Sequence, residues 1–195
     1  MIDLQKLAEQ VPKWYHFPVY QSVFFGGKEI IKGGRNGLGK MSLIRKEDIK
    51  DKVVVDIGCN LGMASFWAIE NGAKQCKGYD VVLEGIELSN RIAKELNVNC
   101  QFEVQDFGVP VEKKGDIAFC FACSDDITKE NEAKKQILLE NLKHYEIVYF
   151  ETHLKGAFPN WNMPSCIRDY FNCEYLGETH GEGNFKRDFY RLTHK

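Results

Sequence analysis

The sequence predicts an α/β fold in which helices cover both faces of a mostly parallel β-sheet. Strand-like and helix-like patterns alternate from residue 53 onward, and the chain ends in a predicted β-hairpin. The 195 residues include 44% hydrophobic and 12% aromatic side chains, which is enough for one substantial core. We therefore expect residues 1–195 to form a single domain.

The segment from Val53 to Asp80 carries the most informative local pattern. Val53–Ile57 is a β-branched, apolar run, as expected of a strand that is buried on both faces. The tight turn Gly58–Gly62 follows, and apolar residues at helical spacing come after it. A second strand over Gln75–Tyr79 ends at Asp80, 22 positions after the first glycine of the turn. The order strand, turn, helix, strand brings Asp80 beside the turn.

The glycine turn and Asp80 have the chemistry of a nucleoside-binding site. Glycines let backbone N–H groups approach a ligand, and a helix N-terminus favours an anionic group. The Asp80 carboxylate can accept hydrogen bonds from two ribose hydroxyls, each contributing roughly 1.5 to 3 kcal/mol. The G-x-G-x-x-G dinucleotide fingerprint is not met, because Asn60 and Met63 stand at its second and third glycine positions. A turn that binds some other nucleotide is the alternative.

The pattern Asp56-x-Gly58-x-Asn60-x-Gly62 resembles motif I of the class I S-adenosylmethionine-dependent methyltransferases. Gln105-Asp106-Phe107 resembles the segment of this family that meets the adenine amino group. The resemblance implies a three-layer, Rossmann-like methyltransferase fold, with a mostly parallel seven-stranded sheet and an antiparallel C-terminal strand. It also implies S-adenosyl-L-methionine as the cofactor, bound by Asp56, Gly58, Cys59, Asn60, Gly62, Asp80, Val81, Asp106, Phe107 and Cys123.

Within this resemblance, each part of the cofactor has an expected partner. The glycine turn packs against the methionine part, Asp80 binds the ribose, and Asp106 with Phe107 meets the adenine. Residues 51–195 are then the cofactor-binding core. Residues 1–50 are implied to be an N-terminal helix and a lid that folds over the pocket.

The first 50 residues contain a helix pattern, a hairpin pattern and a glycine-rich loop. Apolar spacing from Ile2 to Val11 predicts the helix, and Gln21–Phe25 with Glu29–Ile31 predicts the hairpin. The loop over residues 33–40 is not an ATP-binding phosphate loop, because Met41 replaces the hydroxyl residue that would bind magnesium. Candidate acceptor-binding residues here are Tyr15 and Arg35, with a solvated charged loop as the alternative for Arg35.

The elements after Asp80 continue the alternation of helices and strands. Apolar residues between Val82 and Leu96 recur at helical spacing. The other predicted elements are strands over Cys100–Val104, Asp116–Phe121 and Glu146–Thr152, a helix over Lys129–Leu142, and hairpin strands over Cys173–Gly177 and Asp188–Leu192.

His153 and Glu151 are the candidate catalytic residues. They end the strand beside the expected cofactor edge, where either could take a proton from an oxygen or nitrogen nucleophile. Hydrogen-bonded strand-end residues are the alternative reading. The Asn/Asp-Pro-Pro-Tyr signature of nucleobase amino methylation is absent, and Ala122 rather than proline precedes Cys123. Both features argue against nucleobase methylation by those two routes.

The resemblance implies an enzyme that moves a methyl group to an oxygen or nitrogen of a small polar or anionic acceptor. The net charge of −2 gives no overall field that would attract nucleic acid, and basic residues cluster only near the lid and the C-terminus. An RNA (tRNA or rRNA) methyltransferase is the alternative. A non-catalytic protein that retains the S-adenosylmethionine pocket is a third possibility.

The seven cysteines do not suggest disulfides or a metal site. Their number is odd and their spacing irregular, and the only C-x-x-C, Cys120 to Cys123, lies in an apolar strand where residues three apart face opposite sides. We expect buried, reduced thiols and no metal. The chain has no transmembrane pattern and its first residues lack signal-peptide features, so the expected location is the cytoplasm with no membrane partner.

Overall fold

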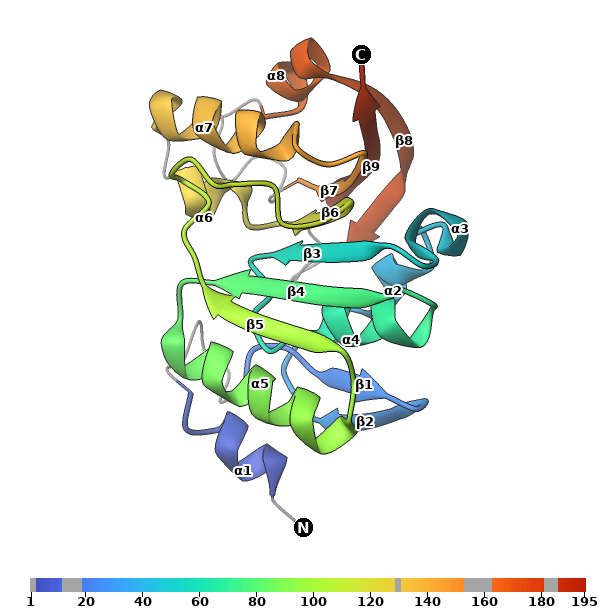
Figure 1. The fold of residues 1–195 in the computed structure, drawn as a ribbon, viewed down its shortest axis with the longest axis vertical. Coiled ribbons are helices and arrows are strands. Elements are labelled where there is room, and N and C mark those ends of the chain that lie inside the picture. Colours follow the sequence, from blue (N-terminus) through green and yellow to red (C-terminus); the bar gives the residue numbers. More distant parts are fainter. Residues whose placement is uncertain (1–2, 12–18, 129–130, 153–162, 181–185) are drawn as a thin grey trace.

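A seven-stranded β-sheet forms the centre of the structure, a computed structural model that describes residues 3–11, 19–128, 131–152, 163–180 and 186–195 (Figure 1). The strands lie in the order β5 (Cys100–Val104), β4 (Gln75–Asp80), β3 (Val53–Ile57), β6 (Ile117–Phe121), β7 (Ile147–Glu151), β9 (Lys186–His194) and β8 (Phe171–His180). The first five are parallel, and β9 is antiparallel to both of its neighbours. The predicted mostly parallel sheet with one antiparallel C-terminal strand is confirmed.

Helices cover both faces of the sheet, because successive side chains along a buried strand point to opposite sides. Val54, Phe119 and Tyr149 belong to one core cluster, while their neighbours along the strands belong to another. The first cluster packs under α2 (Leu38–Met41), α3 (Lys46–Ile49), α4 (Met63–Glu70) and α5 (Leu83–Leu96), and the second under α7 (Glu132–Leu142) and α8 (Met163–Tyr170). None of the helices within the described ranges has the length and apolar character that a membrane crossing requires.

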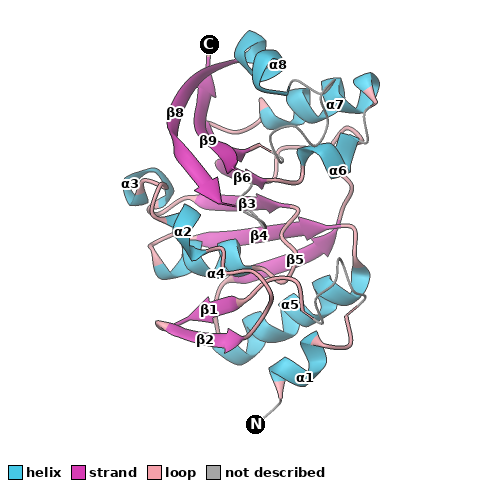
Figure 2. Cartoon of the chain, turned by 180° about the vertical axis from the view of Figure 1, so that it is seen from behind, coloured by secondary structure: helices cyan, strands magenta, loops and turns pink. Residues whose placement is uncertain are grey.

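The N-terminal part of the chain packs on the same side as α4 and α5. Figure 2 shows the hairpin of β1 (Val23–Phe25) and β2 (Lys28–Ile31) beside these helices, with α1 (Leu4–Ala8) below. Val23 and Ile31 are fully buried in the first core cluster. The hairpin is therefore part of the folded body.

Several boundaries differ from those predicted. The helix predicted from Lys129 instead begins at Glu132, because the Asn131 side chain caps it by accepting a hydrogen bond from the Lys134 N–H at 3.1 Å. A separate short helix, α6 (Ser124–Thr128), precedes it. The C-terminal strands are longer than predicted, since they pair with each other from Phe171 to His180. The added residues Glu178–His180 on β8 and Lys186–Arg187 on β9 carry polar side chains, so apolar patterning alone did not predict these parts of the strands.

The expectation that Cys120 and Cys123 face opposite sides is wrong. Their sulfur atoms lie 3.6 Å apart. Strand β6 ends at Phe121, and Ala122 has a φ of +53°, so the chain turns before it reaches Cys123. The hydrogen bond with Cys120 and the burial of the thiol both raise the pKa of Cys123. Within the described ranges, no group of His, Cys, Asp and Glu side chains is placed to hold a metal ion.

An ion-pair network attaches α3 to the sheet. Both carboxylate oxygens of Asp48 accept hydrogen bonds from Arg191 on β9, at 2.7 and 3.1 Å, and Tyr149 on β7 donates its hydroxyl to the same carboxylate at 2.6 Å. Burial alone would raise the pKa of Asp48, but these bonds outweigh it and the pKa is lowered. The network anchors the N-terminal segment that carries Arg35 and Lys40 against the core.

Candidate functional site

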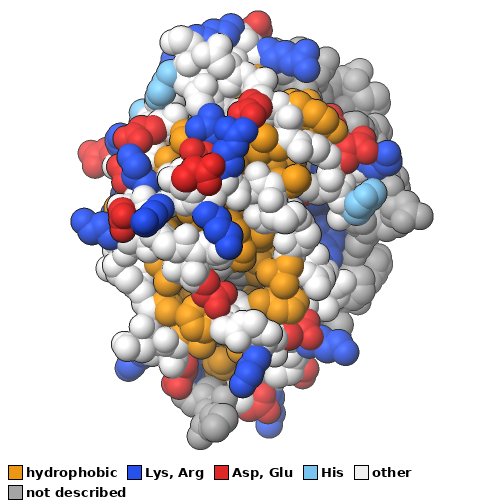
Figure 3. All heavy atoms as spheres, turned by 90° about the vertical axis from the view of Figure 1, so that its right-hand side faces the viewer, with side chains coloured by type: hydrophobic (Ala, Val, Ile, Leu, Met, Phe, Trp, Pro, Cys, Tyr) orange, Lys and Arg blue, Asp and Glu red, His pale blue; other side chains and the backbone are white. Residues whose placement is uncertain are grey.

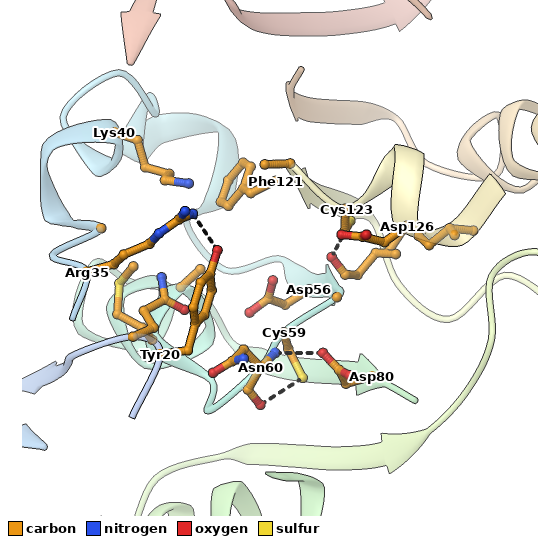
Figure 4. A pocket seen from close by; sticks show the side chains of 18 of the residues that line it. Tyr20, Arg35, Lys40, Asp56, Cys59, Asn60, Asp80, Phe121, Cys123 and Asp126 are labelled. Atoms are coloured by element: carbon orange, nitrogen blue, oxygen red, sulfur yellow. Dashed lines mark hydrogen bonds between the residues drawn. The ribbon is translucent and has the colours of Figure 1, made fainter. Parts of the chain in front are cut away.

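A cavity of about 1060 Å³ lies at the carboxyl ends of the parallel strands (Figure 4). Its lining comes from the ends of β3, β4, β5 and β6, from the segment before β3, and from β8 and β9. Ligands of open α/β sheets bind at this edge, where the strand order reverses. In this sheet the order reverses at β3. The next two strands, β4 and β5, lie on one side of β3, and β6 and β7 lie on the other.

The glycine turn after β3 is shaped by close packing. Gly58 has a φ of +71°, and a Cβ at this position would lie 2.7 Å from the Cβ of Cys123. The N–H groups of Gly58 and Cys59 donate to the carbonyl oxygen of Tyr79, at 2.8 and 3.0 Å. These two donors are therefore used inside the protein, and glycine is required at position 58 for backbone conformation and for the approach of Cys123.

Asp80 fastens this turn to the end of β4. Its Oδ2 accepts from the Asn60 N–H at 2.9 Å, and its Oδ1 accepts from the N–H groups of Val81 and Val82 at 2.8 and 3.2 Å. A carboxylate has about four acceptor positions, so it can still receive a further donor from a ligand in the cavity. The cavity lining includes Asp80, Asn60 and Val81.

Asp56 is a buried carboxylate in the floor of the cavity. It is 3% exposed and accepts from the N–H and the hydroxyl of Ser65, at 3.1 and 2.7 Å. Ser65 lies in the first turn of α4, and Gly62 at the cap of that helix has no side chain to satisfy its N–H groups. Asp56 thus caps α4 from the neighbouring strand. Burial, with a smaller contribution from the charge of Asp80, raises its pKa to about 6.

The raised pKa of Asp56 predicts a loss of stability on going from about pH 4 to about pH 6. In this window the folded protein holds a proton that the unfolded chain, with its ordinary value of 3.8, has released. The free energy of unfolding contributed by Asp56 should fall by on the order of 3 kcal/mol across the window and level off above it. We expect Asp56→Asn, which keeps the shape but cannot ionise, to lack this component. Urea denaturation of both proteins from pH 4 to 7 measures the difference, and parallel pH profiles would contradict the prediction.

Asp106 and Phe107 lie in the part of the cavity beyond the end of β5. Asp106 Oδ1 accepts from the Gly108 N–H at 2.7 Å, and its Oδ2 lies 3.7 Å from the Nζ of Lys134. The Phe107 ring is 2% exposed and packs against the Tyr79 ring with centroids 5.7 Å apart. Acidic side chains predominate on this side, since Asp125 and Asp126 of α6 also line the cavity.

Arg35 faces the cavity from the N-terminal segment. The backbone of Arg35 pairs with that of Tyr20 and Ser22, with N–H to carbonyl oxygen distances of 3.0 and 2.8 Å. This pairing sets the two side chains together: the guanidinium lies 4.7 Å from the centroid of the Tyr20 ring and donates to its hydroxyl. Figure 4 shows Arg35 and Lys40 on the side of the cavity opposite Cys123 and Asp126.

A buried ion cluster forms the wall near the end of β7. The Glu151 side chain is 1% exposed; it accepts a hydrogen bond from Lys40 on one oxygen and from the Thr179 hydroxyl on the other. Arg187 Nη1 lies 3.7 Å from the same oxygen that Lys40 contacts. Lys40, Thr179 and Arg187 line the cavity, whereas Glu151 lies behind them.

The predicted site residues come together with few exceptions. All predicted cofactor-binding residues except Gly62 line the cavity, and Arg35 does as well. Gly62 instead packs under the Phe102 ring, where a Cβ would lie 2.6 Å from a ring carbon. Glu151 lies outside the lining with both oxygens engaged, so its catalytic role stays a prediction. Tyr15 and His153 lie outside the described residues.

Sequence reasoning missed a set of cavity residues that share no local pattern. They come from four separate segments, and their neighbours in the structure are distant in sequence; Lys40 and Glu151, for example, are 111 positions apart. A net excess of basic residues before β3 was the only available signal. The missed residues include Tyr20, Lys40, Thr179, His180 and Arg187.

Comparison with known sequences gives partial matches. No protein-family model matches the chain. The ribosomal protein L11 methyltransferase of Dictyoglomus thermophilum is 31% identical over 88 residues, which are 45% of this chain and 29% of that protein. An uncharacterized protein of Methanocaldococcus jannaschii is 37% identical over 59 residues, which are 30% of this chain and 27% of that protein. The matched segments thus span less than a third of these curated relatives.

Comparison with solved structures gives matches over more of the chain. The bifunctional kinase-methyltransferase WbdD is similar over 98% of this chain and 46% of its own, with a TM-score of 0.78 and 19% identity. Magnesium protoporphyrin IX methyltransferase from Synechocystis PCC 6803, solved with bound SAH, covers 78% of this chain and 79% of its own (TM-score 0.61, 17% identity). The 16S rRNA methylase RmtB covers 81% of this chain and 62% of its own (TM-score 0.61, 18% identity).

Proposed function

We propose that this chain, which has the fold of the class I S-adenosylmethionine-dependent methyltransferases, is an enzyme that uses S-adenosyl-L-methionine to methylate a small acceptor. One observation carries the proposal. The glycine turn after β3, the acid that ends β4 and the Asp106-Phe107 pair after β5 all line one cavity. The sequence resemblance assigned these three segments to the three parts of the cofactor.

The lining residues fit this cofactor in size and in charge. The volume of about 1060 Å³ is at the upper end of the range for small-molecule sites, so it can take a nucleoside together with an acceptor. Asp80 keeps an acceptor position for a ribose hydroxyl, and Asp106 offers a carboxylate to an amino group. Asp56 and Asp80 together place negative charge where a sulfonium would be stabilised.

When bound, the cofactor supplies an electrophilic methyl group. The residues of this chain then have to hold the acceptor oxygen or nitrogen in line with that group and exclude water from the cavity. Holding two reactants in the productive geometry can supply several kcal/mol of the rate enhancement. Arg35, Lys40 and Arg187 also line the cavity, and they favour a polar or anionic acceptor.

RNA is the second candidate acceptor, because several structurally similar proteins methylate it by their own description, RmtB among them. The charge distribution favours it less. On the face seen in Figure 3, Lys and Arg side chains alternate with Asp and Glu and do not form a continuous basic surface. The net charge of −2 points the same way.

The proposal is tested by calorimetric titration of the protein with S-adenosylhomocysteine, with NAD and ATP as comparison ligands. We expect S-adenosylhomocysteine to bind, and NAD and ATP not to bind. Methyl-labelled cofactor is then incubated with the protein and a cell extract, and label is counted separately in the small-molecule and RNA fractions. A folded protein that fails to bind S-adenosylhomocysteine would refute the cofactor assignment. Binding without transfer to any fraction would favour a non-catalytic protein that retains the pocket.

A further inference from the structure

The buried wall beside β7 carries more positive than negative charge. Lys40 and Arg187 have side chains that are 13% and 7% exposed, and both are directed at the single carboxylate of Glu151. The other acid on this wall is Glu178, whose carboxylate lies 2.6 Å from the exposed ammonium of Lys186. Asp56, in the floor, is held by Ser65. The buried Arg187 and the largely buried Lys40 therefore share one buried carboxylate at the edge of the cavity.

Arg187 is incompletely satisfied in this arrangement. Its Nε is buried and has no hydrogen-bond partner in the part of the chain that the structure describes. Its Nη1 approaches Glu151 only to 3.7 Å, which is beyond hydrogen-bonding distance. Buried guanidinium groups are normally paired and hydrogen-bonded, because an unpaired buried charge is costly. The side chain lines the cavity, so the missing partner can be supplied from there.

Neighbouring groups hold Lys40 at the cavity and bring a further cation to it. The Lys40 Nζ lies 5.2 Å from the centroid of the Phe121 ring, and that ring also lines the cavity. The guanidinium of Arg35 enters from the same side as Lys40 (Figure 4). A planar guanidinium beside an ammonium suits an oxyanion with more than one oxygen, such as a phosphate or a carboxylate.

We propose that the wall formed by Lys40 and Arg187 binds an oxyanion, a phosphate or a carboxylate group, carried by the methyl acceptor. That the oxyanion belongs to a methyl acceptor rests on the proposed methyltransferase function. The anion site itself does not depend on that function. Glu151 then acts as the counter-ion that holds the two cations in place. Because Glu151 is itself negatively charged, it also repels the incoming anion.

The site is tested with inorganic phosphate and with malonate as probes, in chloride buffers of matched ionic strength. The thermal midpoint is followed against probe concentration, which gives an apparent dissociation constant. Wild-type protein should be stabilised by at least one of the two probes; preference for phosphate or malonate then assigns the oxyanion. Arg187→Gln should weaken this affinity by about tenfold or more, because it removes a charged donor.

Glu151→Gln provides the second variant, with the opposite expected sign. Glutamine keeps one acceptor oxygen for Lys40, and its NH2 group can donate to the Thr179 hydroxyl. It removes the competing negative charge, so affinity for the probe should rise severalfold. Arg91→Gln, on the exposed side of α5, is the matched control and should leave the affinity for the probe unchanged.

A wild-type protein that binds neither probe would overturn the proposal, as would equal affinities in the wild-type protein and all three folded variants. S-adenosylhomocysteine titrated into the same proteins reports on the cofactor separately, so its failure to bind while phosphate or malonate binds would refute only the methyltransferase assignment.

Discussion

Replacing Asp80 with alanine is expected to lower the affinity for S-adenosylhomocysteine by about 10 to 10²-fold. The one charge-assisted hydrogen bond that Asp80 can still accept from the ribose is lost, and such a bond is worth roughly 1.5 to 3 kcal/mol. The substitution also frees the N–H groups of Asn60, Val81 and Val82, which Asp80 fixes at 2.8 to 3.2 Å. Both effects act on the same wall of the cavity, so the loss should be larger than for other acids in the lining.

Calorimetric titration measures this loss directly. Circular dichroism establishes that the variant is folded before its affinity is interpreted. Asp80→Asn retains an oxygen acceptor without the charge and should lie between alanine and wild type. Glu87→Ala, at an exposed position on α5, is the control and should bind like wild type. A folded Asp80→Ala protein with unchanged affinity would show that the ribose is bound elsewhere.

Replacing Glu151 with leucine is expected to reduce the free energy of unfolding by about 3 to 5 kcal/mol, the usual cost of removing one partner from a buried ion pair. The substitution leaves Lys40 and Arg187 buried without a counter-ion, and it removes the acceptor of the Thr179 hydroxyl. The three groups come from different parts of the chain, so their separation should also loosen the packing of the N-terminal segment on the sheet.

Urea denaturation followed by circular dichroism measures this effect. The control is Glu140→Leu on α7, where the side chain is 48% exposed and lies 2.6 Å from Lys143. Exposed pairs of this kind contribute little, so the control should change stability by less than about 1 kcal/mol. Equal effects of the two substitutions would mean that the buried cluster contributes no more to stability than a surface ion pair.

Local patterns predicted the centre of the fold well. The apolar run before the glycine turn, the turn itself and the acid at the end of β4 lie within 28 consecutive residues, from Val53 to Asp80. Strand, turn and helix there depend on neighbouring residues, because hydrophobic periodicity and glycine conformation act over a few positions. The order of these elements then constrained the sheet, since parallel connections are right-handed and their carboxyl ends share one edge.

For some residues that the sequence analysis selected, the structure shows a different role from the one expected. Gly58 was expected to open its N–H group to a ligand, yet that donor is bound to Tyr79 and the glycine accommodates Cys123. Cys123 itself reaches this position because Ala122 turns the chain after β6. Positive φ at a residue other than glycine has no clear signature in a single sequence. The contact between Gly58 and Cys123 joins the segments that follow β3 and β6, so no local pattern predicts it.

The sequence by itself determined the fold class, the glycine turn and the acid beside it, because each depends on residues close together in the chain. Only the tertiary structure decided the other wall of the cavity. Lys40, Glu151 and Arg187 are separated by 111 and 36 positions, and they meet through the pairing of β7 with β9 and the docking of the N-terminal segment. Their charges interact strongly because burial removes water from between them, and burial is a property of the assembled sheet rather than of any one segment.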